Sequence, residues 1–131
     1  MSQSYRHAKT SVTLINFHFV FCPKRRRKVL VGAVEKDLMA MIQAEALQLR
    51  CEVLALEIMP DHVHLFLNCP PDLAPNKIMH QIKGSTSRAL REKHPRLARM
   101  TSLWTRSYFC STAGNVSAAT IQRYIEQQKT R

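Results

Sequence analysis

A chain of 131 residues, 45% of them hydrophobic, is long enough to bury one core, so we expect a single domain over residues 1–131. Its 20 lysines and arginines outnumber its 9 aspartates and glutamates, and the net charge of +11 indicates a polyanionic partner, although a role in solubility alone or ribosomal-type RNA binding would carry the same charge. No stretch approaches the about 18 apolar residues of a membrane helix, and the polar segment Met1–Thr10 lacks the apolar region of a signal peptide, so no membrane association is expected.

The first part of the chain predicts a strand followed by a helix. Residues Val12–Phe21 are rich in β-branched and aromatic side chains, which favour a strand. Pro23 and a basic cluster at Lys24–Lys28 follow, and this cluster is either a solvated loop or a DNA contact. From Val34 to Leu49, apolar residues recur at helical spacing while acidic residues fall mainly off that stripe, which predicts an amphipathic helix packed on a sheet.

The middle of the chain predicts a hairpin and a second helix. Val53–Met59 and His62–Leu67 are strand-like runs joined by Pro60-Asp61, so a β-hairpin is the natural interpretation. A helix is expected from about Pro75, because proline suits the first helical turn. Its predicted buried stripe comprises Ile78, Met79, Ile82, Thr86, Ala89 and Leu90.

A short strand around Ser107–Thr112 and a last helix, from Ser117 as N-cap to about Lys129, complete the predicted elements. The order strand, helix, strand, strand, helix, strand, helix favours an α+β fold in which helices cover an antiparallel sheet.

The cysteines stand at Cys22, Cys51, Cys69 and Cys110, far apart and without close pairs. This spacing fits reduced, mostly buried thiols better than a disulfide framework or a zinc knuckle. The expected location is therefore the cytoplasm.

The strongest local signal is the pair His62 and His64. Alternate side chains of a strand share a face, so both imidazoles project together while Val63 and Leu65 point into the core. Two imidazoles at this spacing either bind one metal ion, leaving further coordination positions open, or only form local hydrogen bonds.

Two carboxylates lie close to this pair in the predicted hairpin. With a two-residue turn, Glu57 lies directly across from His64 on the same face. Glu57 and Asp61 are candidates to orient the imidazoles, and Glu57 could equally be a further ligand or a plain exposed strand residue.

The second signal is Tyr124 with Gln128, four residues apart and therefore on one face of a helix. A tyrosine oxygen can attack phosphorus when a nearby cation withdraws charge from the phosphate, and a glutamine amide oxygen can bind that cation. The spacing of Ile121, Tyr124 and Ile125 is also that of a core stripe, so Tyr124 could instead be a packed aromatic residue.

Taken together, these segments resemble the small IS200/IS605-type transposases. Glu57–Leu65 resembles the family's HUH motif (His, bulky hydrophobic, His), and Tyr124–Gln128 resembles its single catalytic tyrosine followed by a metal-binding glutamine. Lys83–Arg88, Trp104–Tyr108 and His18–Lys24 are similar to family segments at the same relative places. The resemblance covers nearly the whole chain. Arg25 departs from it, because relatives often carry an aromatic residue there.

The resemblance implies an RRM-like, or ferredoxin-like, sheet and a homodimer whose active sites are shared between subunits. It further implies that His62, His64 and Gln128 hold Mg²⁺ or Mn²⁺, that Tyr124 is the nucleophile, and that the substrate is a single-stranded DNA hairpin at an element end. No small-molecule substrate is implied.

A basic face of the second predicted helix is the leading candidate for DNA binding, although a merely solvated face would look the same. Together with the basic cluster, the residues expected to contact DNA are Lys24, Arg25, Arg26, Lys77, Gln81, Lys83, Gly84, Ser85, Arg88 and Arg91.

Three other interpretations remain open. A non-catalytic RRM-like nucleic-acid binder explains the charge and strand order but not the two residue pairs, and its usual closely spaced aromatic residues are missing from the predicted strands. A domesticated relative acting on repeated palindromes would use the same chemistry. A stable zinc site is disfavoured because only Cys69 lies near the histidines.

Overall fold

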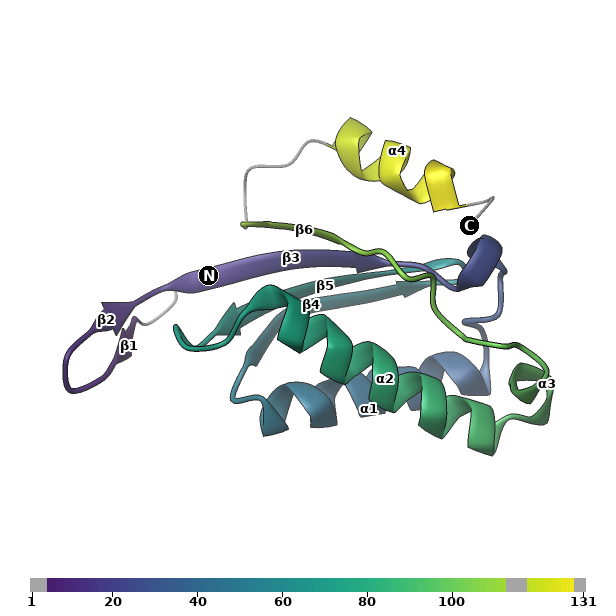
Figure 1. Cartoon of the computed structure of the whole chain (residues 1–131), viewed down its shortest axis with the longest axis horizontal. Coiled ribbons are helices and arrows are strands. Elements are labelled where there is room, and N and C mark those ends of the chain that lie inside the picture. Colours follow the sequence, from purple (N-terminus) through teal and green to yellow (C-terminus); the bar gives the residue numbers. More distant parts are fainter. Residues whose placement is uncertain (1–4, 113–117, 129–131) are drawn as a thin grey trace.

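The computed structural model describes residues 5–112 and 118–128 as a four-stranded antiparallel sheet with helices on both faces (Figure 1). The strands follow the order β4-β5-β3-β6 across the sheet, which is the ferredoxin-like arrangement of a βαββαβ chain. The elements are β1 (Arg6–His7), β2 (Val12–Thr13), β3 (Ile15–Phe21), the 3₁₀ turn η1 (Lys24–Arg26), α1 (Ala33–Gln48), β4 (Glu52–Met59), β5 (His62–Cys69), α2 (Pro75–Lys93), α3 (Pro95–Ala98), β6 (Phe109–Thr112) and α4 (Ala118–Gln127). The predicted α+β class and antiparallel sheet are confirmed.

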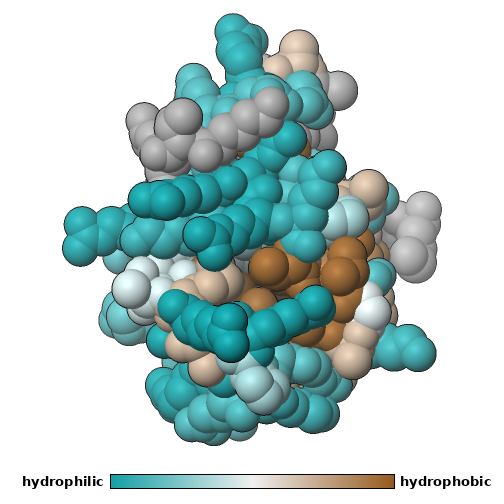
Figure 2. All heavy atoms as spheres, turned by 90° about the vertical axis from the view of Figure 1, so that its right-hand side faces the viewer, coloured by the Kyte–Doolittle hydropathy of each residue, from teal (hydrophilic) through white to brown (hydrophobic). Residues whose placement is uncertain are grey.

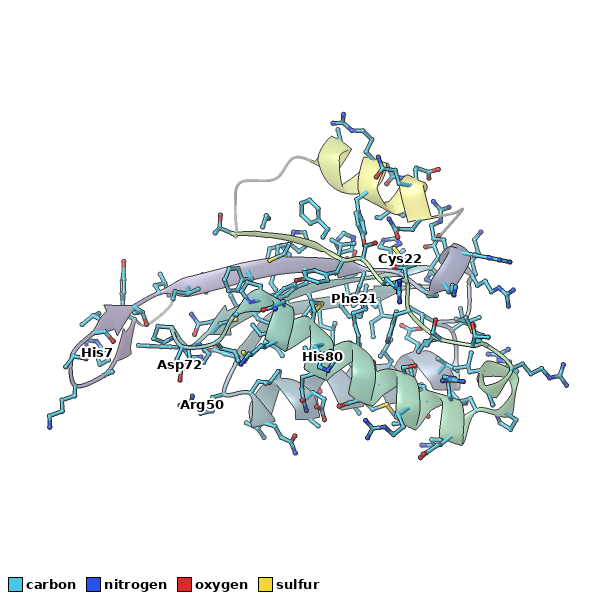
Figure 3. All side chains as sticks on the ribbon, in the orientation of Figure 1. His7, Phe21, Cys22, Arg50, Asp72 and His80 are labelled. Atoms are coloured by element: carbon cyan, nitrogen blue, oxygen red, sulfur yellow. The ribbon has the colours of Figure 1, made fainter. Side chains whose placement is uncertain are left out.

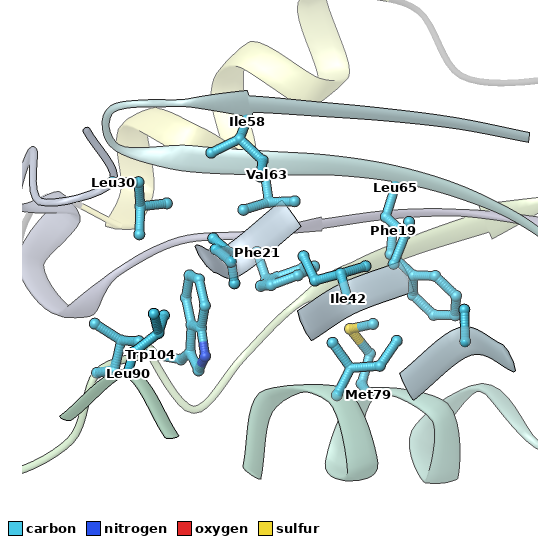
Figure 4. Packing of buried hydrophobic residues seen from close by; sticks show 14 of the residues in the cluster. Phe19, Phe21, Leu30, Ile42, Ile58, Val63, Leu65, Met79, Leu90 and Trp104 are labelled. Atoms are coloured by element: carbon cyan, nitrogen blue, oxygen red, sulfur yellow. The ribbon is translucent and has the colours of Figure 1, made fainter. Parts of the chain in front are cut away.

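Alternating side chains divide the sheet into two faces. Phe19 and Phe21 of β3 are fully buried against the layer formed by α1 and α2, together with Val63 and Leu65 of β5. Figure 4 shows this core, with Ile42 and Met79 among the residues that close it from the helix side. Helix α4 lies on the opposite side of the sheet (Figure 1).

A polar contact is enclosed in the main core. The indole nitrogen of Trp104 donates a hydrogen bond to the hydroxyl oxygen of Thr86 at 3.0 Å, and Thr86 donates in turn to the carbonyl of Ile82. Buried polar groups are stable only when partnered in this way. The contact attaches the segment after α3 to α2.

Several predicted boundaries differ from the observed ones. The expected strand Val12–Phe21 is divided, because Val12–Thr13 pairs with β1 in a separate small hairpin while β3 joins the main sheet. β4 carries a register shift between Val53 and Ala55, and the strand around residues 107–112 begins only at Phe109. The predicted N-cap Ser117 and the helix end at Lys129 lie outside the described residues.

The four cysteines are free thiols; Cys110 is half-buried and the other three are buried, as predicted. Within residues 5–112 and 118–128, every helix is too short or too polar to cross a bilayer.

Candidate metal and tyrosine site

His62 and His64 project from β5 on the sheet face that carries α4. Val63, between them, is fully buried in the core on the other side, as the period-two pattern predicts. The two imidazole rings lie 4.9 Å apart between centroids and are nearly perpendicular. Glu57 pairs directly with His64 in the register of β4 and β5, as predicted, and its side chain is exposed.

Asp61 orients the first of these imidazoles. Nδ1 of His62 lies 2.8 Å from Oδ1 of Asp61, which leaves Nε2 as the ring nitrogen directed to another partner. The second oxygen of Asp61 lies 2.6 Å from Nε of Arg26, and both side chains are largely buried, at 13% and 16% exposure. A carboxylate that holds the far nitrogen of a histidine is a common support for a metal ligand.

His18 of β3, which the pattern of the sequence did not single out, completes a row of imidazoles. Its Nε2 lies 3.2 Å from Nδ1 of His64, and its ring stacks on Phe66 at a centroid distance of 4.0 Å. Burial, and then the neighbouring His64, lower the pKa of His18. Burial lowers the pKa of His64 as well, helped by His62 and opposed by Glu57. Both rings are therefore neutral near pH 7, the state that metal binding requires.

Helix α4 brings Tyr124 over the same face of the sheet. Ile125 packs with Val20 and Cys22 of the β3 region in a small second core, and Tyr124 lies against it. Val20 is the direct pairing partner of His64, so the tyrosine helix lies beside the imidazole row. In Figure 3, Cys22 lies on the α4 side of the sheet and Phe21 on the side of α1 and α2.

Ser107, which precedes β6, connects Tyr124 of α4 with Gln128, which directly follows that helix. Its hydroxyl donates a hydrogen bond to Oε1 of Gln128 at 3.0 Å and lies 3.3 Å from the phenolic oxygen of Tyr124. Gln128 is only 1% exposed, so its amide is held in place within the site. Sequence spacing could not reveal Ser107, because its partners lie 17 and 21 residues further along the chain.

Arg26 ties α4 to the histidine hairpin. Its Nη1 lies 2.8 Å from Oε1 of Glu126, while its Nε lies beside Oδ2 of Asp61. The hydrogen bond to Glu126 and the two carboxylates outweigh burial and raise the pKa of Arg26. Arg26 was expected to contact DNA, but its guanidinium is already engaged by two carboxylates. Arg26 reaches these carboxylates because the turn η1, where Arg26 has a positive φ of 53°, directs its side chain toward α4.

The side chains of this site that could hold a metal ion are His62, His64 and Gln128. In the part of the chain that the structure describes, there is no group of three or more His, Cys, Asp or Glu side chains that could hold a metal ion. The ring nitrogens of His62 and His64 that remain available, and the second lone pair of the Gln128 amide oxygen, are the donor atoms that a cation could use.

The predicted DNA-binding residues of α2 do not form one free face. Lys77 and Arg88 are exposed, and Gly84 is open to solvent with no atom where a Cβ would stand. Gln81 and Ser85 instead turn toward α1, where both donate hydrogen bonds to Oε1 of Glu45, at 2.7 and 3.0 Å. Helical spacing identifies a face but not the neighbour that covers it.

Lys83 and Arg91 are also less free than expected. The ammonium of Lys83 donates to the backbone carbonyls of Thr105, Arg106 and Ser107, and burial lowers its pKa to about 8. Nε of Arg91 is buried without a hydrogen-bond partner among the described atoms. Lys83 thus supports the segment that carries Ser107, which is a role inside the fold.

The fold, with an imidazole pair that faces a tyrosine helix, belongs to the class of the transposases. Residues 11–128 match the family "Transposase IS200 like", and the chain belongs to this family.

Similar proteins bear out this assignment. The ISDra2 transposase TnpA of Deinococcus radiodurans is 36% identical over 117 residues, covering 87% of this chain and 84% of that protein. The transposase for insertion sequence element IS200 of Salmonella typhimurium is 30% identical over 115 residues, covering 86% of this chain and 75% of that protein.

Two solved structures share the fold. A transposase from Deinococcus radiodurans R1 superposes with a TM-score of 0.90 at 31% identity, covering 96% of this chain and 99% of the other. A REP-associated tyrosine transposase bound to a REP hairpin has a TM-score of 0.61 at 16% identity, covering 96% of this chain and 69% of the other, which is a likeness of fold alone.

Proposed function

We propose that this transposase cuts and rejoins single-stranded DNA at the ends of an insertion sequence through a covalent bond to Tyr124. The observation that carries the proposal is that Tyr124 and Gln128, joined through Ser107, lie on the same sheet face as the His62 and His64 pair. Packing alone does not account for a buried glutamine hydrogen-bonded beside a phenol and an imidazole row.

The proposed reaction is a transesterification. The phenolic oxygen of Tyr124 forms a bond to phosphorus, the bond from phosphorus to the 3′ oxygen breaks, and the phenol proton is lost while the 3′ oxygen gains one. The products are a 5′-phosphotyrosine and a free 3′-hydroxyl group. A 3′-hydroxyl of another strand reverses the step, so the phosphodiester energy is kept and no ATP is needed.

His62, His64 and Gln128 would hold the cation, Mg²⁺ or Mn²⁺, through two imidazole nitrogens and one amide oxygen. When bound, it would withdraw charge from the scissile phosphate and offset the charge of the transition state. Asp61 fixes the ring of His62 and His18 contacts that of His64, so both imidazoles are held before substrate arrives.

Mass spectrometry of a protein–oligonucleotide adduct tests the proposal. The protein is incubated with hairpin single-stranded DNA and Mg²⁺, denatured and digested. We expect the DNA on the peptide that contains Tyr124, no adduct with Tyr124→Phe, and a normal adduct with the matched control Tyr108→Phe. An adduct that persists in Tyr124→Phe would show that another residue is the nucleophile.

Hairpin binding is the second part of the proposal. Lys77 and Arg88 are the α2 residues from the expected DNA face that remain exposed and basic, so they are the better candidates to contact the duplex stem. Replacing both by glutamine should weaken hairpin binding and flatten its salt dependence. Unchanged affinity and an unchanged salt slope would show that this face of α2 does not bind the hairpin.

We further propose that the working unit is a homodimer. The active site of such a dimer could be completed within one chain or by Tyr124 of one subunit and the histidines of the other. A mixture of Tyr124→Phe subunits with His62→Ala/His64→Ala subunits separates these two arrangements. Adduct formation by the mixture would indicate a site shared between subunits, whereas an inactive mixture, with both variants dimeric by light scattering, would indicate sites completed within each chain.

A further inference from the structure

Two adjoining hollows lead from a basic cluster to the serine that contacts Tyr124. The first has a volume of about 220 Å³, and its lining includes Lys24, Arg25, Arg27 and Arg99. The second, about 550 Å³, runs past Trp104 and Arg106 to Ser107. Both are lined by Lys24 and Ser102, so they adjoin, and the two together are here called the Lys24–Ser107 groove.

The backbone on the two sides of this groove is held together. The amide of Lys24 donates to the carbonyl of Leu103 at 2.8 Å, and the amide of Thr105 donates to the carbonyl of Cys22 at 3.0 Å. Pro23 forms an isolated antiparallel bridge with Trp104. The groove is therefore built by strand-like pairing between residues 22–24 and 103–105, and its shape does not depend on side chains alone.

The charged side chains that line the groove are all basic. Five of its lining residues are basic, and among the described residues that line it none is acidic. Arg25 is exposed, with a φ of 58°, and unlike Arg26 it forms no ion pair among the described contacts. Figure 2 looks onto this end of the molecule and shows a largely hydrophilic surface, with a hydrophobic patch to one side.

We propose that the Lys24–Ser107 groove binds the phosphates of the single DNA strand next to the scissile bond. Lys24, Arg25, Arg27 and Arg99 hold the strand at the basic end, and the segment from Trp104 to Ser107 directs it to Tyr124. A groove of basic residues that follows the backbone is how proteins hold single strands without reading their sequence. This inference rests on the proposed function, because it needs Tyr124 as the point of cleavage.

The test compares Arg27→Gln/Arg99→Gln with the control Lys9→Gln/Lys36→Gln, which removes the same charge at exposed sites outside the groove. Binding is measured as a function of salt on two substrates, a hairpin with single-stranded arms on both sides and the same hairpin without arms. Loss of two phosphate contacts to a single strand should reduce the slope of log K against log salt by about 1.4 on the armed substrate only. The control pair should leave the slope unchanged.

Arg27→Lys/Arg99→Lys keeps both charges and should keep the slope, which separates lost charge from damage to the fold. A wild-type slope for Arg27→Gln/Arg99→Gln on the armed substrate would overturn the inference, as would an equal loss on the armless hairpin. If the wild-type protein formed no covalent adduct, the proposed chemistry would fail, while the salt slopes would still decide whether this groove holds the strand.

Discussion

The hydroxyl oxygen of Ser107 lies 3.3 Å from the phenolic oxygen of Tyr124. Since Ser107 has one hydroxyl proton and donates it to Oε1 of Gln128, the contact requires Tyr124 to donate to Ser107. The hydrogen bonds therefore run from the phenol through the serine to the glutamine. This arrangement points the phenolic proton of Tyr124 toward Ser107 and holds the amide oxygen of Gln128 by the proton of that serine.

Ser107→Ala should slow adduct formation roughly 3- to 10-fold, because a hydrogen bond of this kind is worth about 0.5–1.5 kcal/mol. The measurement is a single-turnover time course with hairpin DNA. Ser111→Ala is the control, since that hydroxyl bonds only to the neighbouring carbonyl of Thr112 in the described contacts. An unchanged rate would mean that Ser107 is a packing residue.

Asp61→Ala should weaken Mn²⁺ binding about 10- to 100-fold, because it removes the carboxylate that fixes the ring of His62. Asp61→Asn keeps an acceptor oxygen, so its Mn²⁺ affinity should lie between those of Asp61→Ala and the wild type. Calorimetric titration of the DNA-free protein with Mn²⁺ measures the effect. Asp72→Asn, at an exposed pair with Arg50 at the other end of the molecule, is the control (Figure 3). Equal affinities for all variants would contradict a metal site at His62.

Arg26→Gln should loosen α4, because Arg26 is bound to both Glu126 and Asp61. We expect the amides of α4 to exchange about tenfold faster with deuterium, which corresponds to ~1.4 kcal/mol. Glu126→Gln should show a smaller effect on α4 and should not change Mn²⁺ affinity, since it leaves the pair of Arg26 with Asp61 intact. Arg25→Gln is the neighbouring control, and equal exchange in Arg25→Gln and Arg26→Gln would rule out this tether.

Asp37→Asn should destabilise the protein at pH 7 and have little effect in acid. The hydrogen bond from Nε2 of His94 at 2.7 Å, and then that from Lys93, lower the pKa of Asp37 below its ordinary value. The unfolded chain therefore binds this proton at higher pH than the folded protein does. The stability that Asp37 contributes is present above the unfolded pKa of about 3.9 and is lost as the pH falls through the lower folded value.

Urea unfolding at a series of pH values measures this contribution. The midpoint difference between Asp37→Asn and wild type should be present at pH 5 and should shrink as the pH falls below about 4. Asp72→Asn serves again as the exposed comparison. A difference that stayed constant into strong acid would show that the contribution does not come from the charge of Asp37.

Local patterns in the amino-acid sequence determined much of this protein. Period-two alternation placed His62 and His64 on one side of their strand and Val63 in the core, and a spacing of four placed Tyr124 and Gln128 on one side of a helix. These predictions held because the repeat of a strand or helix sets which side chains share a face. The order of the main strands and helices followed from the same repeats and led to the α+β sheet, whereas the small β1–β2 hairpin, η1 and α3 were not predicted.

Only the tertiary structure decided which distant residues join those faces. The register of β3 against β5 brings His18 to His64, the segment before β6 brings Ser107 to Tyr124, and η1 brings Arg26 between Asp61 and Glu126. The same packing brings Gln81 to Glu45 and Lys83 to the carbonyl of Thr105, contacts that helical spacing did not predict. The repeat of a strand or helix determines the direction in which a side chain points. Its partner is determined by how strands pair and helices pack, and both of these depend on the whole core.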